Sequence, residues 1–208
     1  MALVDIYKIK SDVDRSHGLR NIIDHLNDTE INSVIDLFAG DGSFNSWLLY
    51  QLNTKIPDVT HIELDRELYQ KLHERFGRHR NNCINTDTYK FIKDNDKKYD
   101  LVFCDNGMWH HEYFNIIPNL KNILNEGIFI HNINCRPYNN FSNDSEWGVS
   151  RSDFYEMLDT SDCDPEDLLE KTGQKLKDNG FKIKYGKLFP RELYNGHIYL
   201  HFALWYLQ

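Results

Sequence analysis

The stretch Val34-Ile35-Asp36-Leu37-Phe38-Ala39-Gly40-Asp41-Gly42-Ser43-Phe44 decides the fold of this chain. It begins as a mainly apolar run of strand length and ends in two glycines, Gly40 and Gly42. Glycine has no Cβ, so the backbone can turn sharply and a ligand can approach it closely. A helix that follows such a turn presents unpaired N–H groups in its first turn. The stretch therefore predicts a buried strand that turns into a helix at a ligand-binding site.

Short apolar runs alternate with segments of helical period along the rest of the chain. This alternation predicts an α/β fold with a mainly parallel sheet and helices on both faces. Leu68, Leu72 and Phe76 recur at helical spacing and are expected to face the core. The expected strands lie near 33–38, 58–63, 82–84, 99–104 and 127–132, followed by an antiparallel hairpin formed by 181–188 and 197–207.

The bulk composition indicates one globular domain over residues 1–208. No apolar run reaches the roughly 20 residues that cross a bilayer, and the first ten residues lack a signal-peptide core, so we expect a cytoplasmic protein. The 4 cysteines show no CxxC spacing, which favours reduced thiols over disulfides or structural zinc. The net charge of −8 weighs against nucleic acid as a partner.

A polar and acidic insertion at about 135–163 interrupts the alternation. From Asn143 to Glu170 the chain has ten acidic residues and one basic residue. Such a segment is either a solvated face or a lid that selects the substrate. The residues after it begin a helix near Pro165, because proline suits the first helical turn.

An acid on the second strand narrows the choice of ligand. Glu63 ends the apolar run 59–63 and lies 23 residues after Gly40, where a carboxylate can accept the ribose hydroxyls of an adenosine. The chain has no GxxxxGK[ST] motif, and position 45 is Asn where a dinucleotide site needs a small residue. Asp36 and Asp41 would repel a pyrophosphate but suit a ligand with ammonium and sulfonium groups. The pattern favours S-adenosylmethionine over NAD.

These motifs resemble those of the class I S-adenosylmethionine-dependent methyltransferases. The likeness runs from Ser33 to about Asn134 and implies a Rossmann-like methyltransferase fold with a seven-stranded sheet. By this resemblance Asp87 lies against the adenine amino group, and 99–107 is the strand that ends beside the reacting methyl group. The cofactor-binding residues expected from the four motifs are Asp36, Phe38, Ala39, Gly40, Asp41, Gly42, Glu63, Leu64, Asp87, Thr88 and Asp105.

The segment after the fourth strand looks like that of the small-molecule O-methyltransferase branch, which implies a hydroxyl acceptor. Asp105, His110 and His131 are the expected catalytic residues, with a histidine removing the acceptor proton. Some members of that branch hold a divalent cation, but His131-Asn132 lacks the carboxylate that this requires. Magnesium is therefore not favoured, and a softer metal on a His-containing site stays open.

Two alternatives remain beside a small-molecule methyltransferase. RNA methylation is compatible with the fold, but enzymes that methylate nucleic-acid bases at nitrogen carry Asn or Asp followed by Pro-Pro and an aromatic residue after the fourth strand. This chain has Asp105-Asn106-Gly107-Met108 there. A non-catalytic S-adenosylmethionine-binding module is the second alternative, because the acid expected at position 132 is missing.

Overall fold

The structure of the chain is a computed structural model. The residues that the structure describes are 21–22, 24–26, 28–42, 58–77, 82–104, 115–134, 165–192 and 198–208.

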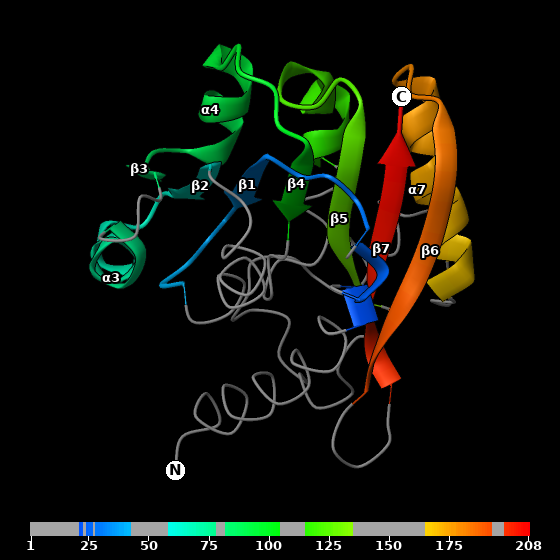
Figure 1. The fold of residues 1–208 in the computed structure, drawn as a ribbon, viewed down its shortest axis with the longest axis horizontal. Helices are drawn as coiled ribbons and strands as arrows, with labels where there is room; N and C mark the ends of the chain where they lie inside the picture. Colours follow the sequence, from blue (N-terminus) through cyan, green and yellow to red (C-terminus); the bar gives the residue numbers. More distant parts are fainter. Residues whose placement is uncertain are drawn as a thin grey trace, which may run out of the picture.

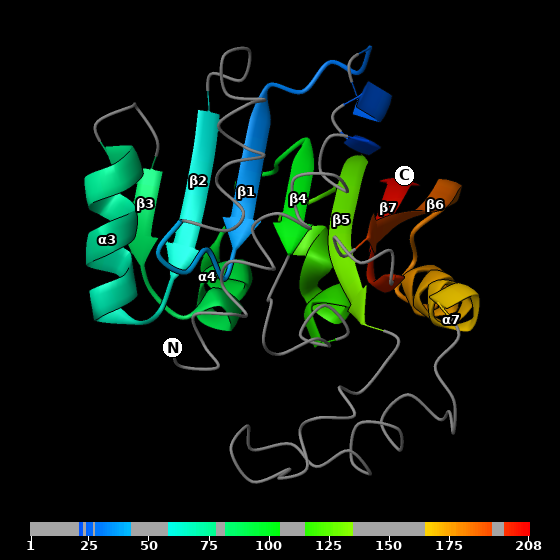
Figure 2. The same cartoon turned by 90° about the horizontal axis from the view of Figure 1, so that it is seen from below.

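In these ranges the strands form one 7-stranded sheet in the order β3-β2-β1-β4-β5-β7-β6. All neighbours pair in parallel except β7, which runs antiparallel to both β5 and β6. Figure 1 and Figure 2 show the sheet from two directions. The strands are β1 Ser33–Leu37, β2 Asp58–Glu63, β3 Asn82–Asn85, β4 Leu101–Cys104, β5 Gly127–Asn134, β6 Ile183–Glu192 and β7 Ile198–Leu207. This confirms the predicted α/β fold class, with its parallel strands and closing antiparallel pair.

Helices pack on both faces of the sheet. One face is covered by α4, the 3-10 helix η2 and α7, as Figure 1 shows, and it buries alternate strand residues such as Ile35 and Phe129. The other face buries Val34 and Phe103 together with Ile22 and Leu26. The helices are α3 Arg66–Phe76, α4 Thr88–Asp94, η2 Ile117–Asn122 and α7 Pro165–Asp178. None of the described helices is long and apolar enough to span a membrane.

The stripe expected on α3 is only partly buried. Leu72 and Phe76 are buried, but Leu68 is 36% exposed, so its assignment to the core was wrong. Leu68 lies in the first turn of the helix, three residues after the N-cap Asp65. The Asp65 side chain accepts hydrogen bonds from the backbone N–H groups of Glu67 and Leu68. The helix therefore packs on the sheet mainly through its last two turns. The start of α7 at Pro165 agrees with the predicted helix start.

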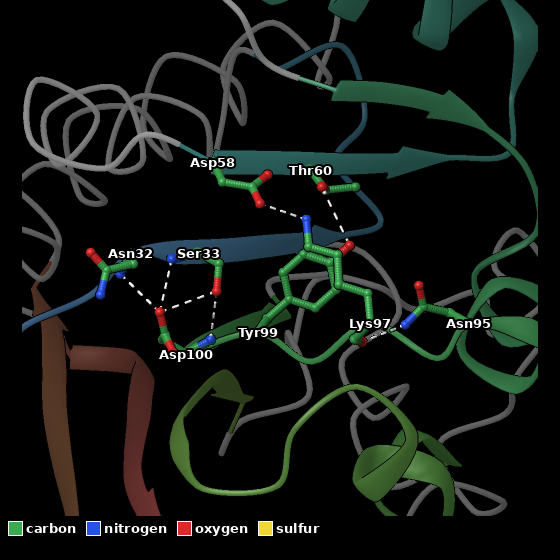
Figure 3. Close-up of polar contacts among 8 residues, drawn as sticks. All are labelled: Asn32, Ser33, Asp58, Thr60, Asn95, Lys97, Tyr99 and Asp100. Atoms are coloured by element: carbon green, nitrogen blue, oxygen red, sulfur yellow. Dashed lines mark hydrogen bonds and ion pairs between the residues drawn. The ribbon is translucent and has the colours of Figure 1, made fainter.

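The amino ends of the central strands are tied together by polar contacts (Figure 3). Asp100 Oδ2 accepts hydrogen bonds from the backbone N–H groups of Asn32 and Ser33, at 2.8 and 2.9 Å. Lys97 pairs with Asp58 at 2.6 Å, which joins the approach to β4 with the start of β2. These contacts lie at the opposite end of the strands from the glycine turn. They hold the strands in one register, so the positions of the carboxyl ends relative to one another are also fixed.

Candidate functional site

The turn after β1 has an unusual backbone. Phe38 has φ of 58°, and Gly40 and Gly42 have φ of 61° and 75°. Glycine adopts such values freely, whereas a bulky residue rarely does. The Phe38 ring is partly buried against the core and lies edge-on to the ring of Tyr89, with centroids 6.1 Å apart. Backbone strain of this kind persists where the surroundings over-determine it, and such places cluster at ligand sites.

The two glycines of the turn have different surroundings. A Cβ at Gly42 would lie 2.6 Å from Phe76 Cε2 and 2.9 Å from Leu72 Cδ1, so α3 packs where a side chain would be. Among the residues that the structure describes, no heavy atom would lie within 4 Å of a Cβ at Gly40. The described residues therefore leave the space over Gly40 open on the side where a side chain would point. Gly42 serves the packing of the helix, and Gly40 leaves room for a ligand.

Glu63 joins this turn to the end of β2. Its Oε2 accepts from the backbone N–H of Gly40 at 2.7 Å, and its Oε1 accepts from the N–H of Asp65 at 2.7 Å. The carboxylate is only 8% exposed. Each carboxylate oxygen can accept a further hydrogen bond, so Glu63 can hold the turn and still accept from a ligand hydroxyl. The backbone of Gly40 and the carboxylate of Glu63 therefore meet at the turn.

The next loop fixes the backbone that follows Glu63. Asn85 Nδ2 donates to the carbonyl oxygens of Glu63 and Leu64, at 2.9 and 2.8 Å. The Leu64 side chain is 63% exposed. Asp87 caps α4 by accepting from the N–H of Lys90 at 2.8 Å, and Thr88 is buried. The residues at the ends of β1, β2 and β3 therefore share one edge of the sheet.

Asp36 lies inside the sheet layers and not at the surface of the turn. Its side chain is fully buried, and its Oδ2 lies 2.9 Å from Nδ1 of His61, which is also fully buried. This arrangement argues against the direct cofactor contact that the sequence analysis gave Asp36. Ala39, also expected at the cofactor, is buried with Leu72 and Phe76, and its N–H donates to the Ile62 carbonyl at 2.9 Å. Asp41 is half-buried at the turn.

His131 is buried in the core and has hydrogen-bond partners on both ring nitrogens. Its Nε2 accepts from Trp205 Nε1 at 3.0 Å, and its Nδ1 lies 3.1 Å from the carbonyl oxygen of Asn132. Burial lowers the pKa of His131 to about 3, because a cation is poorly solvated there. A fully buried ring in this state cannot collect a proton from an acceptor near neutral pH. The geometry argues against the predicted catalytic role of His131.

The other two expected catalytic residues, Asp105 and His110, lie outside the described residues, as does the insertion at 135–163. In the part of the chain that the structure describes, no group of three or more His, Cys, Asp or Glu side chains is placed to hold a metal ion.

Sequence reasoning missed two residues that shape this site. Asn85 fixes the Leu64 backbone, and His61 is the buried partner of Asp36. A signal for His61 was available, because a polar residue within the apolar run 59–63 must find a partner when the strand is buried on both faces. The position of Asn85 one strand further along gave no comparable signal.

The family match agrees with this site. The sequence model of one family, Ribosomal RNA adenine dimethylase, matches residues 14–144, which is more than half of the 208 residues. The matched range includes the glycine turn, Glu63 and Asp87. No curated protein is similar enough in sequence to count as a match.

Solved methyltransferases share the fold at low sequence identity. An S-adenosylmethionine-dependent methyltransferase from Clostridium acetobutylicum is 16% identical over 98% of this chain and 96% of that chain, with a TM-score of 0.61. The magnesium protoporphyrin IX methyltransferase of Synechocystis is 14% identical over 99% and 88%, with a TM-score of 0.58. TYW2 of M. jannaschii, solved with S-adenosylmethionine, is 17% identical over 92% and 76%, with a TM-score of 0.55. At these identities the likeness shows the Rossmann-like methyltransferase fold. Together with the family match, it establishes that the chain belongs to the ribosomal RNA adenine dimethylase family and is an S-adenosylmethionine-dependent methyltransferase.

Proposed function

We propose that the cofactor binds at the carboxyl ends of β1, β2 and β3, over Gly40 and against Glu63. The observation that carries this proposal is the 2.7 Å hydrogen bond from the Gly40 N–H to Glu63 Oε2, together with the space that the described part of the chain leaves open over Gly40. In open α/β sheets, ligands bind at the carboxyl ends of the strands, where the strand order reverses. Here the order reverses between β1 and β4.

Each side chain of the edge has a role that fits its surroundings. The Glu63 carboxylate accepts the ribose hydroxyls, and the exposed Leu64 covers one face of the adenine ring. The Asp87 carboxylate accepts one hydrogen bond from the backbone N–H of Lys90, and its remaining acceptor sites accept from the adenine amino group. Asp41 lies at the turn, on the side of the ammonium and sulfonium groups. Asp36 lies buried beneath the turn, where it pairs with His61 and does not contact the cofactor directly.

We further propose that the acceptor is a small molecule and that the methyl group goes to a hydroxyl oxygen. The cofactor supplies an electrophilic methyl group on a sulfonium. The chain must align the acceptor oxygen with that group and remove the hydroxyl proton. His110, six residues after the end of β4, is the proposed base. Asp105, directly after β4, is the proposed positioning acid.

Two features of the sequence support a small acceptor. Asp105-Asn106-Gly107-Met108 departs from the Pro-Pro-aromatic pattern of enzymes that methylate nucleic-acid bases at nitrogen. The net charge of −8 also opposes the approach of a polyphosphate. The family match favours a second candidate, methylation of an adenine in RNA, because that family is named for this reaction.

Cofactor binding is tested by isothermal titration calorimetry with Glu63→Gln. The variant keeps one side-chain oxygen, which can accept from the Gly40 N–H. It loses the second oxygen, which accepts from the Asp65 N–H, and the charge that strengthens hydrogen bonds to the ribose. We expect it to bind S-adenosylmethionine about tenfold more weakly, as for the loss of one charge-assisted hydrogen bond. Leu176→Ala is the control, since this buried residue lies far from the turn in sequence, on α7, which packs against β5 and β6. Equal affinity of Glu63→Gln and wild type would remove Glu63 from the site.

The acceptor is tested by turnover with tritiated cofactor. Catechols and other hydroxylated small molecules are compared with an adenine-containing RNA oligonucleotide. Label in a small hydroxylated product, lost in His110→Ala, supports the proposal. Label in RNA adenine only would replace it with the second candidate.

A further inference from the structure

A buried carboxylate–imidazole pair lies beneath the glycine turn. Asp36 and His61 are direct cross-strand partners on β1 and β2, and the exposed fraction of both side chains is 0%. The distance between Asp36 Oδ2 and His61 Nδ1 is 2.9 Å. When Asp36 is ionised its carboxylate only accepts hydrogen bonds, and Nδ1 of His61 is then the donor. The hydrogen bond thus fixes the orientation of the imidazole ring.

The His61 ring connects this pair to α3. Its centroid lies 5.4 Å from that of Phe76, with 30° between the ring planes. Phe76 in turn occupies the space beside Gly42, where its Cε2 would lie 2.6 Å from a Cβ. A continuous set of contacts therefore runs from Asp36 through His61 and Phe76 to the second glycine of the turn.

The same pair joins the two strands whose ends meet at the proposed cofactor site. On β1, Asp36 lies four residues before Gly40 of the turn. On β2, His61 lies two residues before Glu63. The negative charge of Asp36 also reaches β3, where burial and then this charge raise the pKa of the Cys83 thiol to about 11. The thiol is therefore protonated at neutral pH.

We propose that Asp36 and His61 are positioning residues for cofactor binding. Their hydrogen bond holds the His61 ring against Phe76, and Phe76 holds the turn at Gly42 in the form that leaves Gly40 open. Neither side chain touches the cofactor. This inference rests on the proposed cofactor site, and it explains the acid of the first motif without a direct ligand contact.

Two substitutions at position 36 separate positioning from charge. Asp36→Asn removes the charge and keeps an oxygen that accepts from His61 Nδ1. Asp36→Leu removes both and leaves an apolar side chain of similar size. We expect Asp36→Leu to weaken binding of both S-adenosylmethionine and S-adenosylhomocysteine about tenfold or more, because a displaced binding group loses its alignment. Asp36→Asn should stay within about twofold of wild type for both ligands.

Phe76→Leu tests the contact between Phe76 and Gly42, and it replaces Asp36→Leu as the test if that variant does not fold. It should weaken the binding of both ligands to a similar extent, because the smaller side chain releases Gly42. Leu176→Ala is the control for general destabilisation, since it removes core packing on α7 and should leave both affinities unchanged.

The outcomes distinguish this inference from the proposed site. Wild-type protein that binds neither ligand would overturn the cofactor site and this inference together. Wild-type binding with unchanged affinity in Asp36→Leu, or in Phe76→Leu where the former does not fold, would overturn this inference alone. Weaker binding of S-adenosylmethionine but not of S-adenosylhomocysteine in Asp36→Asn would also overturn it, because the sulfonium charge would then be sensed directly.

Discussion

At the scale of single residues, the two glycines of the turn give opposite predictions. Gly40→Ala should leave the fold intact at a cost of about 1 kcal/mol, because alanine is strained at φ of 61° but meets no neighbour among the described residues. The methyl group would occupy the open space, so we expect binding of S-adenosylmethionine to be lost. Calorimetric titration of the cofactor and urea unfolding measure the two effects.

Gly42→Ala is the matched variant on the same turn. Its Cβ would overlap Phe76 and Leu72, so we expect a larger loss of stability, about 1–3 kcal/mol beyond the backbone strain. If Gly40→Ala bound the cofactor normally, or if Gly42→Ala were the more stable of the two, the division of roles between the glycines would be wrong.

The buried His131 predicts a pH dependence of stability. In the unfolded chain imidazole titrates near 6.5, whereas in the folded protein burial lowers the pKa to about 3. Below pH ~6.5 the unfolded state binds a proton that the native state does not, so the free energy of unfolding falls by about 1.4 kcal/mol per pH unit towards pH ~3. The contribution of neutral His131 to the free energy of unfolding is complete above pH ~6.5 and is lost as the pH falls.

His131→Gln removes this titration while its amide oxygen can still accept from Trp205. We measure the free energy of unfolding in urea at several pH values between about 7.5 and 4.5. Relative to wild type, the free energy of unfolding of the variant should rise by about 2–3 kcal/mol as the pH falls. Parallel stability curves for the two proteins would contradict the assignment of a neutral, buried His131.

At the scale of elements, the apolar runs predicted the strands well. The runs near 58–63 and 127–132 became β2 and β5 because short apolar segments are buried as central strands. The contacts across strands were not predictable. His61 meets Asp36, and Trp205 meets His131, 74 residues away. A period of two residues gives the face of a side chain, but it does not name the partner on the neighbouring strand.

The packing of β6, β7 and α7 depends on two more glycines. Trp205 of β7 lies between Gly186 of β6 and Gly173 of α7, and a Cβ at Gly186 would lie 2.5 Å from Trp205 Cζ3. We expect Gly186→Ala to cost about 1–3 kcal/mol in urea unfolding. Gly173→Ala should be close to neutral, because the gain in helix propensity of about 1 kcal/mol offsets a contact of 3.2 Å.

A double-mutant cycle tests whether the indole causes this cost. In the Trp205→Leu background, Gly186→Ala should cost less than about 0.5 kcal/mol, because the clashing ring is gone. An equal cost in both backgrounds would place the strain in the β6 backbone instead.

At the scale of the whole molecule, the order of the strands explains how a linear motif becomes a site. Glu63 ends β2, and Gly40 and Asp87 shortly follow β1 and β3; these three strands are adjacent in the sheet, so parallel pairing brings the residues to one edge. Sequence reasoning could predict this edge, because each residue ends or shortly follows a recognisable strand. It could not predict that Asp36 is buried, since the same residue pattern fits either a ligand contact or a supporting pair.

The whole-molecule charge bears on the acceptor. A protein that contacts six to ten phosphates loses roughly 10³–10⁵-fold in affinity between 50 and 200 mM salt, and such contacts require lysine or arginine. With a net charge of −8, we expect a fluorescein-labelled single-stranded RNA to bind no more tightly than about 100 μM at 200 mM NaCl, as for weak non-specific binding. Fluorescence anisotropy at 50 and 200 mM NaCl, with cofactor present, measures this. Micromolar binding at 200 mM NaCl would show a local basic surface that overcomes the net charge, and it would move the acceptor assignment to RNA adenine.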